Sequence, residues 1–297
     1  INGQLRKVHV FTMALPFSDM FFVAAFPREC SEAFWDGHVR AFEFFGGVPR
    51  RISYDNLRIA VKQITGCHQR QLTDGFLRLK SHFLFESHFC TVRRPNEKGV
   101  VELMARYARS NFMVPVPQVK DFEELNENLR QACWNEQFRT VRGKSQSKQQ
   151  LWQDEAQTFL PLPSSLFDIS RKESVRANSL SLVRFHCNEY SVPVRYGHHK
   201  LTVKGYIHHI EIYTPAGHKV AEHRRIWEKE QVLYNPRHYL PLLDHKPGAL
   251  DYAQPLLALE LPECFDILRK RLESEVDEKH KGTKEYIAVL RLIERYS

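Results

Sequence analysis

The chain has 297 residues, 42% of them apolar, which is enough for two or three domains with cores of their own and argues against an intrinsically disordered chain. No window approaches the 18 uncharged apolar residues of a membrane-spanning helix, and no basic-then-apolar leader stands at the start. The formal net charge of +8 favours an anionic partner, most commonly nucleic acid. The six cysteines follow no regular spacing, so we expect free thiols in a reducing, cytoplasmic setting. Because the chain begins with Ile1 rather than Met, we also expect it to be part of a longer protein.

The first half of the chain alternates strands and helices. Residues 7–14 and 20–26 are predicted strands joined by a turn, and Ser31 is predicted to cap a helix that ends at Gly46-Gly47. The pattern continues with a strand over 49–55, a helix capped by Thr73, a strand over 89–93 and a helix over 97–112. This order predicts an α/β domain with layers of helices on one mixed sheet.

After a polar and basic stretch, the second half of the chain shows a different residue pattern. We predict an amphipathic helix over 121–139, a linker over 142–150 and a boundary at 161–164. Short alternating segments at 192–196, 201–204, 209–213 and 219–223 predict a small β-barrel within 166–226, which holds ten Lys and Arg against five Asp and Glu. Two helices are expected at 262–277 and 283–296, separated by a stop and cap at Gly282-Thr283, with the second helix packed on its own domain.

Two carboxylates occupy positions that suit metal-dependent chemistry. Asp55 ends a strand, and Glu102 lies about one and a half turns into the helix over 97–112. Phosphoryl transfer needs hard oxygen ligands for two divalent ions, and carboxylates on rigid elements can supply them. Lys98 lies one turn before Glu102, and Arg106 and Arg109 lie one and two turns after it, so this face could meet a phosphate backbone. The alternative is that Asp55 is a turn or cap residue and that Glu102 interacts with the helix dipole.

A family resemblance favours the catalytic interpretation. Residues 54–61 (YDNLRIAV) and 98–102 (KGVVE) resemble the second and third acidic motifs of the integrase-type catalytic core. More narrowly, the chain resembles the large transposase IstA of the istA/istB insertion sequences, with further matching stretches at 2–11, 106–112, 188–194, 246–249 and 282–286.

The resemblance implies an RNase H-like catalytic core, incomplete at its N-terminus, with an Asp, Asp, Glu triad that holds Mg²⁺ or Mn²⁺. Asp55 would be the second member and Glu102 the third, while the first would lie on a strand just before Ile1. The resemblance also implies binding to element ends and target DNA, a homo-oligomer on DNA, a partner ATPase of the IstB type, no membrane association, and a cytoplasmic, nucleoid-associated place in a bacterium.

We therefore expect a truncated catalytic core over 1–118, a helical linker over 119–165, a small basic β-barrel over 166–232 and a helical C-terminal region over 233–297. In the barrel, Arg184, Arg195, Lys200 and Lys204 are the candidate DNA-binding residues, although such cations could merely keep a small β domain in solution. The expected function is metal-dependent phosphodiester hydrolysis and strand transfer at insertion-sequence ends. The alternative is a truncated, catalytically inactive DNA-binding relic, and a host RNase H-like nuclease is a weaker third hypothesis.

Overall fold

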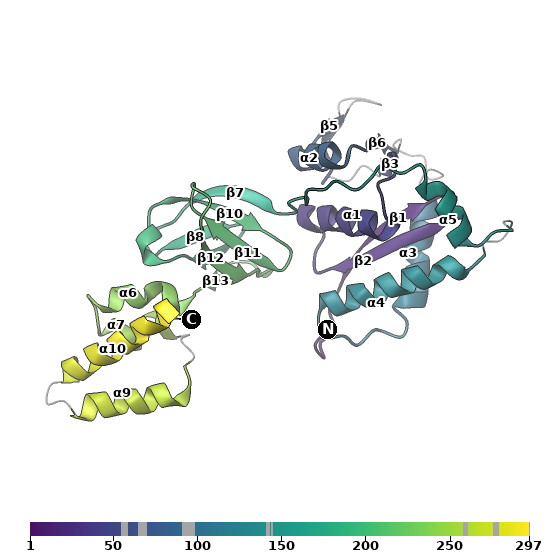
Figure 1. Ribbon diagram of the computed structural model, residues 1–297. Helices are drawn as coiled ribbons and strands as arrows, with labels where there is room; N and C mark the ends of the chain where they lie inside the picture. The colour runs from purple at the N-terminus through teal and green to yellow at the C-terminus, as the bar shows by residue number, and fades with distance from the viewer. Residues whose placement is uncertain are drawn as a thin grey trace. The chain divides into compact units, whose positions relative to one another are not determined.

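The structure, a computed structural model, describes residues 1–54, 59–64, 70–90, 99–140, 143, 145–257, 261–275 and 279–296. It divides into two units, Ile1–Ile169 and Ser170–Ser297, each with its own interior (Figure 1). In the described part, no helix is both long enough and apolar enough to cross a bilayer.

The first unit is mixed α/β. Its strands are β1 (His9–Leu15), β2 (Met20–Phe26), β3 (Arg51–Tyr54), β4 (Val61–Ile64), β5 (Arg70–Leu72) and β6 (Glu86–Phe89). Its helices are α1 (Ser31–Phe45), α2 (Asp74–Phe83), α3 (Gly99–Phe112), α4 (Phe122–Asn135) and α5 (Lys148–Ala156), with a short 3-10 turn η2 (Glu136–Phe138) after α4.

The β1–β2 hairpin forms the centre of this unit. The two strands pair antiparallel in register from His9–Phe26 to Leu15–Met20, as the sequence predicted, and every residue of β2 is buried. Helix α4 runs beside the outer edge of β2, where the Asn126 amide accepts from the Ala25 backbone N–H at 2.6 Å and donates to the Ala25 carbonyl at 3.0 Å. A side chain thus completes the backbone pairing that an edge strand otherwise leaves open.

Among the described residues, the strands do not form the single mixed sheet that the sequence predicted. In the described residues, β1–β2, β3–β6 and β4–β5 are separate two-stranded sheets, and β3 pairs with β6 in parallel. Helix α1 joins the first two pairs through its aromatic face. Phe34 lies 6.4 Å from the ring of Phe11 on β1 and 6.0 Å from that of Tyr54 on β3. Gly37 allows this contact with β1, because a Cβ there would collide with the Phe11 ring.

Several element boundaries differ from the predicted ones for local reasons. The Cys30 sulfur, not Ser31, caps α1 by accepting from the Ala33 N–H at 3.5 Å, whereas Gly46 ends the helix in the left-handed region as predicted. The β4–β5 hairpin was not predicted. The predicted linker over 142–150 ends in the first turn of α5, because Ser147 and Gln150 form a reciprocal capping box.

The second unit begins with two small sheets around one apolar core. Strands β12 (Lys219–Arg224), β11 (His209–Tyr213), β10 (Lys200–Gly205) and β7 (Arg171–Arg176) form one sheet in that order, and β13 (Val232–Leu233), β9 (Asn188–Ser191) and β8 (Leu182–Phe185) form the other. Alternating residues of both sheets, among them Val183, Tyr190, Val203 and Ile210, fill the space between them. The predicted strand over 192–196 is wrong, since Pro193 precedes a 3-10 turn, η3 (Val194–Tyr196).

The C-terminal part is helical, with η4 (Pro236–Tyr239), α6 (Leu240–Leu243), α7 (Ala249–Tyr252), α8 (Gln254–Leu257), α9 (Glu263–Glu275) and α10 (Lys279–Tyr296). Tyr286, Ile287 and Leu290 of α10 are buried in a core of their own, as expected for a helix packed on its own domain. The predicted stop at Gly282-Thr283 is wrong, because both residues lie inside α10. A Cβ at Gly282 would collide with the backbone of Leu272, so this glycine permits the close approach of α9 and α10.

Asn126 gives a direct test of the edge contact on β2. We expect Asn126→Ala to lower the free energy of unfolding by about 1–3 kcal/mol, because it leaves the buried N–H and C=O of Ala25 without that partner. Asn128→Ala, at an exposed position on the same helix, is the matched control. Urea unfolding of the two variants should separate them, and equal midpoints would contradict the contact.

Candidate functional site

The end of β3 is held by a buried hydrogen-bond chain. The Tyr54 hydroxyl lies 3.0 Å from Nε2 of His38, and Nδ1 of His38 lies 2.7 Å from the carbonyl oxygen of Phe34. Because a carbonyl can only accept, His38 carries its proton on Nδ1, and Tyr54 donates to Nε2. Burial lowers the pKa of His38 to about 4 and raises that of Tyr54 well above its usual range, so both groups are neutral near pH 7.

Sequence reasoning missed this pair. The available signal was that His38 lies four residues after Phe34 and four before Phe42, on the buried face of α1. The residue that follows Tyr54 is Asp55, so the chain immediately before the predicted catalytic carboxylate is anchored to α1.

Helix α3 is anchored through the face opposite to Glu102. The Tyr107 and Phe112 rings lie 5.9 and 6.0 Å from that of Phe21 on β2, and the Tyr107 hydroxyl donates to Glu136 at 2.9 Å. These contacts fix which way α3 faces. Glu102, Arg106 and Arg109, spaced at i, i+4 and i+7, are exposed on a common side of the helix.

Glu136 also connects α3 to the following helices. Its carboxylate lies 3.2 Å from the Arg139 guanidinium and 3.5 Å from the ammonium of Lys148, and both Glu136 and Lys148 are buried. Arg139 in turn contacts the Tyr107 hydroxyl. Removing the Glu136 carboxylate would leave the Lys148 charge buried without its partner, so this cluster keeps α3, η2 and α5 together.

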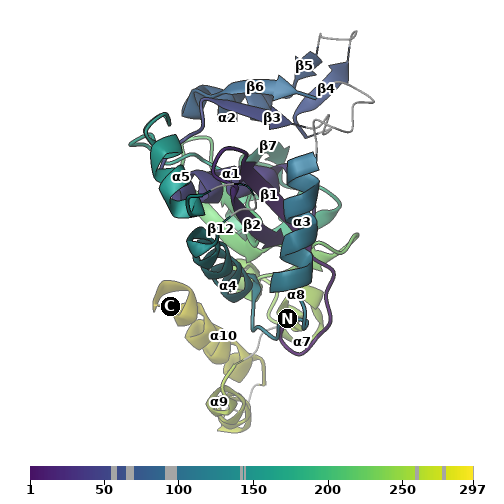
Figure 2. The same ribbon diagram turned by 90° about the vertical axis from the view of Figure 1, so that its right-hand side faces the viewer.

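The predicted catalytic pair is only partly within the described structure. Asp55 and Lys98 lie outside the described residues. Glu102 is in the first turn of α3. In both views, this end of the helix is the one nearer to the β3–β6 pair (Figures 1 and 2). Tyr54, the last residue of β3, is paired with Phe89 of β6. Among the described residues, no group of three His, Cys, Asp or Glu side chains could hold a metal ion.

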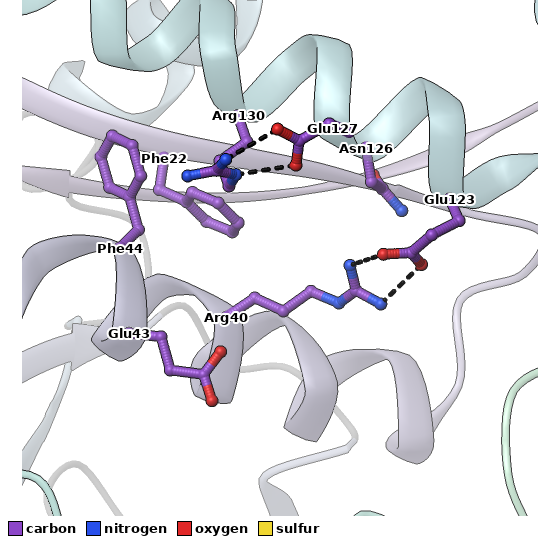
Figure 3. Close-up of a pocket in the computed structure, with 8 residues that line it drawn as sticks. All are labelled: Phe22, Arg40, Glu43, Phe44, Glu123, Asn126, Glu127 and Arg130. Carbon is purple, nitrogen blue, oxygen red and sulfur yellow. Dashed lines mark hydrogen bonds and ion pairs between the residues drawn. The ribbon is translucent and has the colours of Figure 1, made fainter.

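A cavity of about 350 Å³ lies elsewhere in the first unit, between α1 and α4 over β2 (Figure 3). Four of its five charged side chains form ion pairs with each other. Arg40 lies 3.0 Å from Glu123, and Arg130 lies 2.7 Å from Glu127. The lining thus mixes both signs of charge, and its two cations are engaged in pairs, which suits a packed helix interface better than a phosphate or metal site.

The four candidate DNA-binding residues of the second unit do not form one group. Lys200 and Lys204 are on β10, on the outer side of the four-stranded sheet. Arg184 is on the outer side of the other sheet, between buried Val183 and Phe185, and Arg195 is in η3 beside the Tyr196 ring. The structure therefore places only Lys200 and Lys204 on a shared surface.

Comparison with known proteins identifies the relatives of this chain. Residues 162–235 match the family described as "Mu transposase, C-terminal domain". A transposase of Aminobacter aminovorans is 31% identical over 99% of this chain and 57% of its own length, and the transposase for insertion sequences IS1326/IS1353 of Pseudomonas aeruginosa is 29% identical over the same shares. The transposase for insertion sequence element IS21 of Pseudomonas aeruginosa is 32% identical over 65% of this chain and 50% of its own length.

The family resemblance inferred from the sequence is confirmed by these relatives, and the chain spans a little over half the length of the first two. One solved structure, a simian T-cell lymphotropic virus intasome in complex with a PP2A regulatory subunit, is 13% identical with a TM-score of 0.40 over 77% of this chain and 73% of that chain. A TM-score this low does not establish a common fold.

Burial of His38 makes stability depend on pH. The unfolded chain binds a proton at this histidine near its ordinary pKa of 6.5, whereas the folded chain binds it only near 4. Stability is therefore lost as pH falls from about 6.5 to 4, by about 1.4 kcal/mol per pH unit for one proton. When the free energy of unfolding is measured with urea across this pH range, we expect His38→Gln to lower its dependence on pH by the amount that corresponds to about one proton. Tyr54→Phe keeps the imidazole and should keep the slope, and equal slopes in wild type and His38→Gln would contradict the assignment.

Proposed function

We propose, from the premise that this chain is a homologue of the IS21-family transposases over nearly its whole length, that it contains most of the catalytic machinery of a metal-dependent DNA transposase. The reaction would be hydrolysis of a phosphodiester at the insertion-sequence end, followed by attack of the freed 3′-OH on a phosphodiester of the target DNA. The observation that carries the proposal is the match over 99% of the chain to two transposases, one of which is the transposase for insertion sequences IS1326/IS1353.

In this proposal the first unit is an RNase H-like core, and Asp55 and Glu102 are its second and third catalytic carboxylates. Two features of the described residues support that assignment. The chain just before Asp55 is held rigidly by the Tyr54–His38 hydrogen bond, and Glu102 is an exposed carboxylate in the first turn of an anchored helix. Catalytic groups need such preorganised supports, because small misplacements are costly in rate.

The residues present fit a hard divalent ion such as Mg²⁺ or Mn²⁺. Glu102 offers carboxylate oxygens to solvent, and Asp55 would add a second all-oxygen donor. The Asp, Asp, Glu triad that the family resemblance implies would add a third carboxylate to these two. Divalent ions held there would stabilise charge on the attacking and leaving oxygens. Lys98, Arg106 and Arg109 would position the DNA backbone beside these carboxylates.

The proposal extends to partners in the same terms. DNA at the element ends and target is the substrate, and the second unit would grip it through Arg184, Arg195, Lys200 and Lys204. A homo-oligomer on DNA and an IstB-type ATPase helper follow from the family. The alternative, a DNA-binding relic without catalysis, shares the DNA contacts but lacks the metal-dependent step.

Substitution of the two carboxylates separates the alternatives. We expect the 297-residue chain alone to be inactive in strand transfer, and the chain extended by its native upstream segment to join a 3′-OH donor duplex to plasmid DNA with Mg²⁺. Asp55→Asn or Glu102→Gln in the extended protein should reduce joining about a hundredfold or more, the range for loss of one group that stabilises transition-state charge.

Glu97 is the matched control, since it lies five residues before Glu102 and outside the acidic motif. Glu97→Gln should retain joining, and all three variants should retain DNA binding. Robust joining by Glu102→Gln, or by the 297-residue chain alone, would contradict the assigned triad. An extended protein that binds DNA but joins none would favour the relic.

DNA binding by the second unit should be strongly salt-dependent. Each phosphate contact releases counterions, so a plot of log affinity against log salt should have a slope of about −0.9 per contact. We expect each of four single changes to lower the magnitude of this slope when the protein is titrated against element-end duplex. The changes are Arg184→Ala, Arg195→Ala, Lys200→Ala and Lys204→Ala. If all four changes leave both the affinity and the slope unchanged, the second unit is not the part of the chain that binds DNA.

A further inference from the structure

Two short loops meet at one end of the four-stranded sheet of the second unit. The loop after β7 and the turn before β10 are joined by backbone hydrogen bonds, since the Ala177 N–H donates to the His199 carbonyl and the His198 N–H donates to the Ala177 carbonyl, both at 3.1 Å. Arg176 is directly opposite Lys200 where the pairing of the two strands ends. We call this part of the surface the basic corner and define it by four exposed residues, Arg176, His198, His199 and Lys200.

The basic corner lies in a part of the chain that carries no acidic side chain. Residues 176–188 and 190–210 contain no Asp or Glu. Among the described residues, no carboxylate forms an ion pair with any of the four corner side chains, and the Arg176 guanidinium instead donates to the His198 carbonyl at 3.2 Å. An anion that approaches the corner therefore meets cations without competition from a neighbouring carboxylate.

Other cations of the β part are placed differently. Arg184 is directly opposite Glu189, and Lys204 is directly opposite Glu211. Acidic residues thus stand beside two of the four cations that the sequence indicated, whereas Lys200 belongs to the basic corner.

The elements that pack beside the corner add no acid. The 3-10 turn η3 carries Arg195 as its charged residue. The turn η4 reaches the loop after β7 through the Tyr239 hydroxyl, which donates to the Leu180 carbonyl at 2.8 Å, and its other titratable residues are Arg237 and His238. Neither turn contains Asp or Glu, so the charge on the rings of His198 and His199 is the variable part of a positive environment.

The hydrogen bond of His199 decides what its ring can offer a ligand. Nδ1 lies 2.9 Å from the Gly197 carbonyl oxygen, and because a carbonyl can only accept, Nδ1 carries a proton. The ring contacts the edge of Tyr196, with centroids 6.1 Å apart. The neutral ring presents the lone pair of Nε2, which repels a phosphate oxygen, whereas the protonated ring presents a charged N–H donor. Protonation thus converts Nε2 of His199 from an acceptor into a donor.

His198 is fixed through its backbone while its side chain is exposed. Its N–H is bonded to Ala177 and its carbonyl to Arg176, and its backbone lies in the left-handed region with a φ of 62°. The ring is thereby kept at the corner, next to His199 in the chain. Histidine is the side chain whose charge ordinarily changes between pH 5 and 8, so both rings can add positive charge to the corner in that range.

From this arrangement we propose that DNA binding by the second unit is linked to protonation of His198 and His199, so that the basic corner binds a backbone phosphate more tightly as the pH falls towards 6. A phosphate beside the rings favours their charged forms, and by linkage the charged forms favour the phosphate. Contacts of this kind carry no base specificity. The inference rests on the proposed DNA-binding function and adds its regulation by pH.

Two double variants of the 297-residue chain test this linkage. His198→Gln/His199→Gln removes both rings of the corner, and His218→Gln/His245→Gln removes two exposed histidines elsewhere in the second unit. The probe is a 30-base-pair duplex of arbitrary sequence, titrated at constant salt at pH 6, 7 and 8. The corner variant should bind like the unaltered chain at pH 8 and about three- to tenfold more weakly at pH 6, because each linked proton contributes at most about one log unit of affinity per pH unit. The control variant should follow the unaltered chain at every pH.

The outcomes separate the proposal from its alternatives. Equal binding by the corner variant and the unaltered chain at pH 6 would overturn it. A loss of the same size at pH 6 and pH 8 would also overturn it, since the protonation state would then not matter. An equal loss in the control variant would show that binding follows net charge alone. If the unaltered chain binds no duplex at any pH, the proposed DNA-binding function fails first; if it binds with an affinity that does not change between pH 8 and 6, only the proton linkage fails.

Discussion

The first unit depends on the aromatic face of α1, because this face joins strand pairs that share no backbone hydrogen bonds in the described residues. Phe34 and His38 lie between Phe11 of β1 and Tyr54 of β3, and His38 adds hydrogen bonds to the Phe34 carbonyl and the Tyr54 hydroxyl. In an ordinary sheet the backbone ladder sets the distance between neighbouring strands. Here side-chain packing and one neutral imidazole do so, and they hold Tyr54, the residue that precedes Asp55 in the sequence.

The second support is electrostatic. Glu136 receives a hydrogen bond from Tyr107 and forms ion pairs with Arg139 and Lys148, so side chains from α3, the end of η2 and α5 meet at one buried carboxylate. A buried cluster of this kind adds little net stability but tolerates the loss of a partner poorly. Its consequence for function is orientation, since Tyr107 lies five residues after Glu102 on the same helix. The exposed side of α3 can therefore present Glu102, Arg106 and Arg109 because the other side is fixed.

Local patterns predicted most of the elements. Apolar runs joined by a turn predicted the β1–β2 hairpin, and turn and cap chemistry predicted the start of α2 at Thr73 and the end of α1 at Gly46. Tertiary contacts decided what the sequence could not. Gly282 resembles a helix stop, yet it lies within α10 because α9 packs closely against it. Likewise, a list of cations could not show that Lys200 and Lys204 are opposite Arg176 and Lys172, because register is a property of strand pairing. The pairing of Asp55 with Glu102 remains a prediction from motif order.

The central claim is that the chain after Tyr54 and the first turn of α3 converge on one divalent-ion site. Metal-directed cleavage tests this most directly: Fe²⁺ with ascorbate and peroxide is added to the protein extended by its native upstream segment, and the backbone cuts are mapped. The account predicts cuts near both residue 55 and residue 102, suppressed together by excess Mg²⁺ and absent in Glu102→Gln. Cuts near only one of these positions, or cuts that Mg²⁺ does not suppress, would contradict it.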